Sequence, residues 1–229
     1  MQVLLAGDST VANCPAGETP MSGWGAHLGA PLNAALAFRA SRAGRPAQVV
    51  GVVNVAKGGA NTSSFRGEGL WDALLLASTP GDLVIMQFGH NDQKIPTLAP
   101  REGFARNLER FVEECLERGQ RPVLCTSVAR RRFVEGRLVP TLGEYPEAVL
   151  ELGARLDVPV VDLHAVTSRL YEAWGDEGSR VLFTQFLADQ HPLYRIGIAD
   201  DTHFSITGAQ AVAHEVAAAL VPLIEEARA

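Results

Sequence analysis

A serine, an aspartate and a histidine occur in this chain at positions that suit acyl transfer. Ser9 follows a short apolar run near the start of the chain, and Asp200 and His203 lie three residues apart near its end. At that spacing the carboxylate can accept the Nδ1 hydrogen of the imidazole, which leaves Nε2 free to take a proton from a serine hydroxyl. These residues predict a nucleophilic Ser9, with His203 as its base and Asp200 as the orienting carboxylate.

Other interpretations of these three residues remain open. A serine after a strand can cap the helix that follows it, and an acidic pair beside a histidine can belong to a surface loop. Asp201 could supply the carboxylate, although the spacing favours Asp200. The Gly-x-Ser-x-Gly elbow of α/β-hydrolases does not surround Ser9, so the nucleophile needs another kind of turn.

An acyl-transfer site also needs hydrogen-bond donors for the negatively charged oxygen of its intermediate. Asn91 offers a side-chain amide, and Gly58 and Gly59 offer backbone N–H groups that no Cβ shields. The N–H of Ser9 is a further donor. An Asx turn at Asn91 and a tight turn at the glycines are the ordinary structural alternatives.

Strand and helix patterns alternate along the chain, which predicts an α/β fold with a doubly wound parallel sheet. We expect strands at residues 2–6, 48–53, 83–87, 122–127 and 158–162, and helices at 25–38, 70–76, 101–118, 144–156 and 207–227. A hairpin is expected at 133–141, and residues 164–200 are expected to hold a helix at 164–174, a second element near 180–188 and then a loop. Polar residues at 7–10, 54–59 and 89–92 follow the ends of the first three expected strands. Open α/β sheets bind ligands at these ends. The cluster at 200–203 is expected in a turn before the last helix.

Composition and charge narrow the class of protein. The 229 residues are 47% hydrophobic and 20% charged, with a net charge of -6, which indicates one globular domain over residues 1–229 and no nucleic-acid partner. The arginines at 130–132 are interpreted as a solvated turn. No apolar stretch reaches the ~18 residues that a membrane-spanning helix needs, so no membrane span is expected. Three scattered cysteines and no visible leader favour a reducing, cytoplasmic location. The oligomeric state is not predicted.

Across four separated blocks the chain resembles the SGNH/GDSL hydrolase superfamily, through Ser9, Gly59, Asn91 and His203. More narrowly, it resembles the rhamnogalacturonan acetylesterases of carbohydrate esterase family 12. The matching motifs are Gly-Asp-Ser-Thr-Val-Ala at 7–12, Gly-Trp-Gly at 23–25, Asn-Val-Ala at 54–56, Ser-Ser-Phe at 63–65, Gln-Phe-Gly-His-Asn-Asp at 87–92, Asp-Asp-Thr-His-Phe at 200–204 and Gly-Ala at 208–209. The resemblance implies a flavodoxin-like three-layer α/β/α sandwich with about five parallel strands. It also implies no metal or organic cofactor, and an oxyanion hole made of the Ser9 and Gly59 N–H groups and the Asn91 side chain.

The resemblance further implies a serine esterase that removes acetyl groups from carbohydrate, with pectin or rhamnogalacturonan oligosaccharides as substrates. The second block reads Gly-Ala-Asn at 59–61 where the family commonly has Gly-Arg-Ser, so a uronate-binding arginine is missing there. The alternatives are a general short-chain esterase, with an apolar groove built from residues 164–200, and a carbohydrate-binding protein without catalysis.

Several residues beside the site have expected roles of their own. Asp8 and Asp92 are expected to hold loop backbone by hydrogen bonds. Trp24 and His90 are candidate substrate-binding residues, with core packing of Trp24 and a structural imidazole at His90 as alternatives. His90, Asp92, Asp200 and His203 lack the paired spacing of common zinc motifs, so no metal site is expected.

Overall fold

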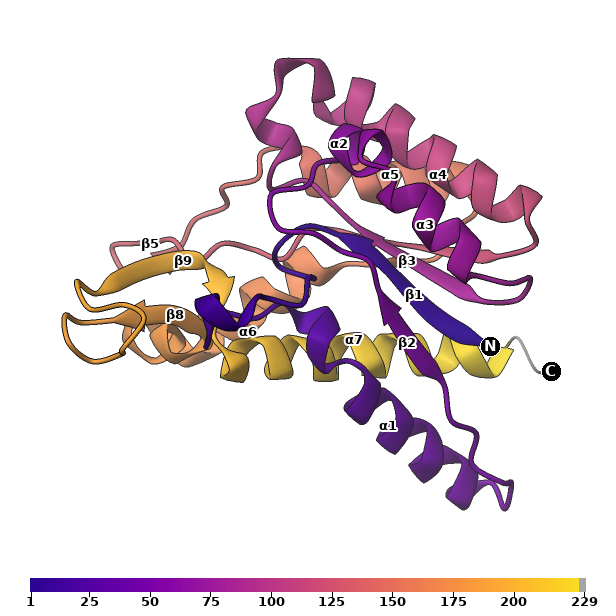
Figure 1. Cartoon of the computed structure of the whole chain (residues 1–229), viewed down its shortest axis with the longest axis horizontal. Helices are drawn as coiled ribbons and strands as arrows, with labels where there is room; N and C mark the ends of the chain where they lie inside the picture. The colour runs from indigo at the N-terminus through magenta and orange to yellow at the C-terminus, as the bar shows by residue number, and fades with distance from the viewer. Residues whose placement is uncertain (227–229) are drawn as a thin grey trace.

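A central sheet of five parallel strands forms the middle layer of the structure (Figure 1), a computed structural model that describes residues 1–226. The strand order is β2-β1-β3-β4-β7. The strands are β1 (Gln2–Gly7), β2 (Gly51–Asn54), β3 (Leu83–Gln87), β4 (Arg121–Cys125) and β7 (Val160–Val161). The predicted flavodoxin-like α/β/α fold is therefore confirmed. In this order β2 lies on one side of β1 and β3 on the other, so the strand order reverses between β1 and β3. Open α/β sheets bind ligands at the carboxyl ends of the strands where the order reverses.

Helices cover both faces of the sheet (Figure 1). They are α1 (Gly29–Arg42), α2 (Thr62–Gly67), α3 (Leu70–Ala77), α4 (Ala105–Glu117), α5 (Tyr145–Leu156), α6 (Leu163–Ser179) and α7 (Ile206–Glu226). In β1, Val3 and Leu5 face α1, α6 and α7, whereas Leu4 and Ala6 face α2 to α5. Because successive side chains in a strand point to opposite faces, a strand buried on both sides reads as one continuous apolar run.

Two antiparallel strand pairs lie outside the main sheet. The expected hairpin at 133–141 is the short pair β5 (Phe133–Val134) and β6 (Arg137–Leu138). The larger pair joins β8 (Phe183–Phe186) and β9 (Ile198–Phe204). The turn expected at 200–203 is therefore wrong, because residues 198–204 form a strand, whereas residues 187–197 form the loop expected after the element near 180–188. Sequence periodicity missed the strand since its partner lies across an irregular segment of the chain.

Other boundaries also differ from the sequence expectation. The expected helix at 25–38 is a 3₁₀ turn (Trp24–His27) followed by α1, which ends before Gly44 at a φ of 63°. Irregular backbone at Pro100–Phe104 precedes α4. The expected element near 180–188 is a 3₁₀ turn (Arg180–Leu182) followed by β8. The short α2 was missed, although Asn61 and Ser64 form a capping box at its start.

The last helix, α7, packs along the sheet beside α1 (Figure 1). Ala227, the expected final residue of this helix, lies outside the described residues. Within residues 1–226, α7 alone is long and apolar enough, by length and composition, to cross a membrane. This corrects the expectation that no stretch would reach that length. Nine of its residues are buried in the protein core, which accounts for the apolar composition.

Candidate active site

The side chains of Ser9, His203 and Asp200 form one chain of hydrogen bonds. Ser9 Oγ lies 2.9 Å from His203 Nε2, and His203 Nδ1 lies 2.7 Å from Asp200 Oδ2. The side chains of His203 and Asp200 are 30% and 20% exposed, so the site opens to solvent. The structure thus brings together all three residues that the sequence predicted, and Asp200 rather than Asp201 is the carboxylate at the imidazole.

Asp200 also shapes the backbone that carries His203. Its Oδ1 atom accepts hydrogen bonds from the backbone N–H of Thr202 at 2.7 Å and of His203 at 2.8 Å. One oxygen of this carboxylate therefore binds the imidazole, and the other binds the backbone of Thr202 and His203 in β9. Three-residue spacing is what this double use requires, and it is the local signal by which the sequence revealed the pair.

The pKa values of Asp200 and His203 shift in opposite directions, as expected for a charged carboxylate hydrogen-bonded to an imidazole. Burial raises the pKa of Asp200, but hydrogen bonds from His203 and Thr202 outweigh it and hold that pKa below its ordinary value. The hydrogen bond and charge of Asp200 raise the pKa of His203, against burial that lowers it. A raised pKa makes His203 a stronger base towards Ser9, at the cost of losing its neutral form at a higher pH.

Ser9 begins a helical turn directly after β1. The carbonyl of Asp8 accepts hydrogen bonds from Val11 N at 3.1 Å and Ala12 N at 3.0 Å, which closes the turn. The N–H of Ser9 points out of such a first turn, and within residues 1–226 it has no acceptor. A backbone donor and the hydroxyl therefore belong to the same half-buried residue.

The other two expected oxyanion donors lie on the neighbouring loops. Gly59 adopts a φ of 78°, and a side chain there would meet nothing within 4 Å, so its backbone faces open space. Its N–H has no acceptor among the described residues. Asn91 donates one amide hydrogen to the Ala60 carbonyl at 3.0 Å, which leaves the second hydrogen for a ligand. The loops after β1, β2 and β3 thus each supply one donor.

Asp8 and Asp92 hold loop backbone, as predicted. Asp8 Oδ1 accepts hydrogen bonds from the N–H and the hydroxyl of Thr10, at 2.9 and 2.8 Å. Asp92 Oδ1 binds the same two groups of Thr62, at 2.9 and 2.7 Å, and so ties the loop after β3 to the start of α2. Both carboxyls are buried, and burial raises the pKa of each above its ordinary value.

The expectation that Trp24 contacts substrate is wrong. Its side chain is 0% exposed, and its Nε1 donates a hydrogen bond to Gln87 Oε1 at 2.9 Å. A Cβ at the preceding Gly23 would lie 2.4 Å from the Val11 backbone, so the Gly-Trp-Gly motif lets two segments pack closely. Trp24 therefore anchors the loop beside Ser9 in the core and offers no surface to a sugar.

His90 does not line an open pocket either. Its side chain is 3% exposed, and neither ring nitrogen has a hydrogen-bond partner among residues 1–226. Burial, with the nearby charges of Arg130 and His203, lowers the pKa of His90 to about 3. The imidazole is therefore a neutral buried group beneath the site, which corrects its substrate-binding role and favours the structural alternative.

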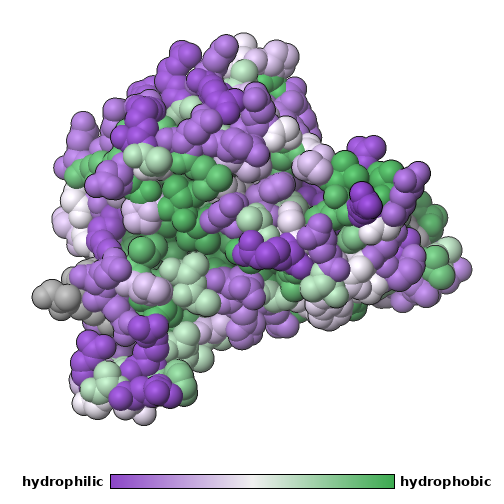
Figure 2. Space-filling view, turned by 180° about the vertical axis from the view of Figure 1, so that it is seen from behind, coloured by the Kyte–Doolittle hydropathy of each residue, from purple (hydrophilic) through white to green (hydrophobic). Residues whose placement is uncertain are grey.

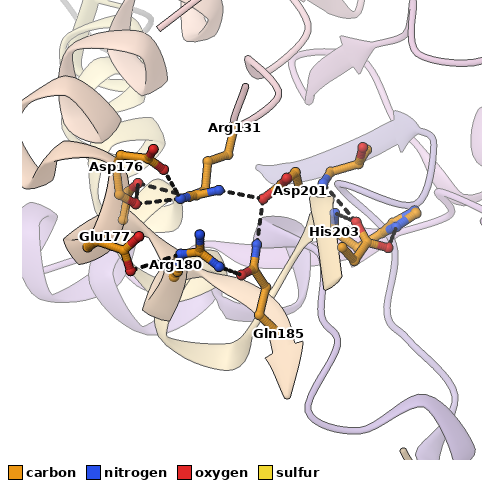
Figure 3. Close-up of polar contacts among 10 residues, drawn as sticks. Arg131, Asp176, Glu177, Arg180, Gln185, Asp201 and His203 are labelled. Atoms are coloured by element: carbon orange, nitrogen blue, oxygen red, sulfur yellow. Dashed lines mark hydrogen bonds and ion pairs between the residues drawn. The ribbon is translucent and has the colours of Figure 1, made fainter. Parts of the chain in front are cut away.

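Arg131 is a functional neighbour that sequence reasoning missed, since residues 130–132 were interpreted as a solvated turn. Its side chain is 5% exposed and lies between two carboxylates (Figure 3). Nη1 donates to Asp201 Oδ1 at 2.8 Å, and Nη2 binds Asp176. Its backbone N–H also donates to the Asp201 carbonyl at 2.8 Å. Arg131 therefore holds β9 in place through Asp201, the residue next to Asp200. Nothing local in the sequence distinguishes it from Arg132, which is exposed.

A cavity of about 800 Å³ lies on the β8–β9 strand pair and is lined by neither Ser9, Asp200 nor His203. Phe183, Phe186 and Ile198 are among its apolar lining residues. Figure 2 shows apolar side chains gathered on this part of the molecule, where Ile196 is 95% exposed. Residues 164–200, which were expected to supply an apolar groove, do contribute to one, but none of the three catalytic side chains lines it.

Within residues 1–226, no group of three or more His, Cys, Asp or Glu side chains is arranged to hold a metal ion. The site does hold a serine hydroxyl, an imidazole and a carboxylate joined by hydrogen bonds. These groups suit attack on a carbonyl carbon, and the donors on the three neighbouring loops remain the predicted stabilisers of the oxyanion that forms.

Comparison with known proteins identifies the family and the fold. Residues 5–211 match the GDSL-like lipase/acylhydrolase family. The chain is 47% identical over 218 residues to the rhamnogalacturonan acetylesterase RhgT of Bacillus subtilis, covering 95% of this chain and 88% of that protein. The crystal structure of YxiM from Bacillus subtilis superposes with a TM-score of 0.74 at 23% identity, over 97% of this chain and 56% of that one. A variant of an acetyl xylan esterase from Geobacillus stearothermophilus gives a TM-score of 0.60 at 17% identity, over 97% and 94% of the two chains.

Proposed function

The chain belongs to the GDSL-like lipase/acylhydrolase family and is a carboxylic ester hydrolase, and we propose that it removes acetyl groups from rhamnogalacturonan-derived oligosaccharides. The hydrogen-bonded chain from Ser9 through His203 to Asp200 is the observation that carries the reaction. The substrate rests on the 47% identity to an enzyme named for this polymer.

The geometry accounts for a two-step reaction. Ser9 Oγ attacks the acetyl carbonyl while His203 Nε2 takes its proton, and Asp200 stabilises the imidazolium that results. The carbonyl oxygen becomes negatively charged, facing the N–H groups of Ser9 and Gly59 and the free amide hydrogen of Asn91. His203 then gives the proton to the sugar oxygen, which leaves as an alcohol. Water attacks the acetyl-enzyme by the same proton route and releases acetate.

Ser9→Ala tests the reaction directly, with 4-nitrophenyl acetate as substrate. Ser41→Ala is a matched control, because Ser41 is exposed at the end of α1. We expect near-background turnover from Ser9→Ala, wild-type turnover from Ser41→Ala, and unchanged circular dichroism for both. Equal hydrolysis by Ser9→Ala and wild type would refute the proposed nucleophile and favour a binding protein without catalysis.

The substrate class is tested separately from the reaction. Acetylated rhamnogalacturonan oligosaccharides, acetylated xylo-oligosaccharides and nitrophenyl esters of increasing chain length are compared by kcat/KM. We expect the acetylated rhamnogalacturonan to be preferred. A preference for long acyl chains would instead support a general esterase that uses the apolar groove on β8 and β9.

We propose a cytoplasmic location, in which the enzyme acts on imported oligosaccharides. All three cysteines are free thiols, and Cys115 and Cys125 are buried. Free thiols persist in reducing compartments. Fractionation of cells that produce the protein from its own gene tests this, and activity recovered mainly outside the cells would refute it.

A further inference from the structure

The chain has only two lysines among its twenty basic residues, and both follow strands that border the active site. Lys57 lies after β2, where its ammonium group pairs with Glu68. Lys94 lies after β3, and its Nζ donates a hydrogen bond to Asn91 Oδ1 at 2.8 Å. Only Lys94 therefore touches a group of the proposed oxyanion hole.

We propose that Lys94 is a positioning residue, which orients the Asn91 amide as an oxyanion donor and strengthens it. This inference rests on the proposed role of Asn91 in the esterase reaction. It adds a residue to the site that neither the sequence motifs nor the geometry of the Ser9–His203–Asp200 chain identifies.

The two ends of the Asn91 amide are held by groups of opposite kind. Oδ1 accepts from the Lys94 ammonium at 2.8 Å, and Nδ2 donates to the Ala60 carbonyl at 3.0 Å. An ammonium can only donate and a carbonyl can only accept. A flipped amide would therefore place donor against donor and acceptor against acceptor. These two partners select the one orientation in which an amide hydrogen is left for the substrate oxygen.

The charge of Lys94 has a second effect on the same amide. A hydrogen bond from a cation to a carbonyl oxygen is stronger than one from a neutral donor, and it draws electron density towards Oδ1. The N–H groups at the other end of the conjugated amide then become better donors, because hydrogen bonds in a chain polarise one another. This effect grows as negative charge develops on the substrate oxygen, so it favours the transition state and raises kcat.

Three substitutions at Lys94 separate these effects, measured with 4-nitrophenyl acetate because its lack of charge removes any attraction of an acidic sugar. Lys94→Met keeps the apolar stem and should lower kcat roughly 3- to 10-fold with little change in KM. Lys94→Arg keeps the cationic donor and should recover most of the rate. Lys94→Glu presents an acceptor to the amide, favours the flipped orientation, and should approach the 10²- to 10³-fold loss expected for Asn91→Ala, on the order of other oxyanion-hole deletions.

Lys57→Met is the matched control, because it removes the same charge and keeps the same apolar stem on the neighbouring loop, without contact to Asn91. We expect its kcat to stay close to that of the wild type. Equal losses in Lys57→Met and Lys94→Met would overturn the proposal and assign the effect to long-range charge. A wild-type kcat in Lys94→Met would overturn it as well.

A double-mutant cycle tests whether Lys94 acts through Asn91. In the Asn91→Ala background, Lys94→Met should cause no further loss of kcat. A second, independent 3- to 10-fold loss would refute the positioning role, since the removed amide can no longer transmit it. If Ser9→Ala or Asn91→Ala itself keeps wild-type activity, the proposed reaction fails rather than the link between Lys94 and Asn91. Thermal denaturation of each variant confirms that the protein folds.

Discussion

Replacing Asp200 by asparagine should stop catalysis while leaving the protein folded. Asp200 Oδ1 accepts two backbone hydrogen bonds, from Thr202 N and His203 N, and asparagine can keep both with its own Oδ1. Its amide nitrogen then takes the place of Oδ2, 2.7 Å from His203 Nδ1. Two donors cannot share that contact, so the imidazole hydrogen moves to Nε2, which can no longer accept the proton of Ser9.

Wrong tautomers of this kind cost about 10⁴ in kcat in serine hydrolases, which corresponds to about 5 kcal/mol of transition-state stabilisation. Asp200→Ala is the comparison, because it leaves both backbone N–H groups without their acceptor and should lower the free energy of unfolding by about 1–3 kcal/mol. The assay is kcat on 4-nitrophenyl acetate, together with urea denaturation. A kcat above one-tenth of the wild type in Asp200→Asn, or a stability below that of Asp200→Ala, would refute this reasoning.

Three further predictions test the surroundings of the site. Asp200 raises the pKa of His203, and only the neutral imidazole can accept the proton of Ser9. As the pH is lowered, kcat/KM should therefore fall with a midpoint above the ordinary histidine pKa of about 6.5. A midpoint below pH 6 would contradict this. Arg131→Met should lower the free energy of unfolding by about 1–3 kcal/mol and reduce kcat, because Asp201 loses a buried partner. Arg132 is exposed, so Arg132→Met is the control and should change neither quantity. Thermal denaturation and kinetics measure the two effects. Trp24→Phe should lower the free energy of unfolding by about 1–3 kcal/mol, because it leaves Gln87 Oε1 without its donor. Unchanged stability together with a raised KM for oligosaccharide would instead show that Trp24 contacts the substrate.

The sequence was informative wherever a signal is local. Alternating apolar runs and helical patterns indicated the parallel sheet, since a strand buried on both faces needs a continuous apolar stretch. The three-residue spacing of Asp200 and His203 indicated their hydrogen bond, because both partners lie close together on one short segment, β9. The Gly-Asp-Ser and Gly-His-Asn-Asp motifs, which follow β1 and β3, indicated which loops carry the nucleophile and an oxyanion donor.

Only the tertiary structure decided the roles that depend on distant partners. Trp24 is buried where Gln87, at the end of β3, accepts its hydrogen bond, and that partner lies 63 residues away in the sequence. Residues 198–204 are a strand because β8 pairs with them, and a single segment cannot reveal a partner it meets only after folding. Arg131 and Arg132 are adjacent and alike in sequence, yet one is buried between Asp176 and Asp201 while the other is exposed. Composition and spacing specify which groups are present, whereas burial and pairing arise from contacts between segments that the chain brings together only when it folds.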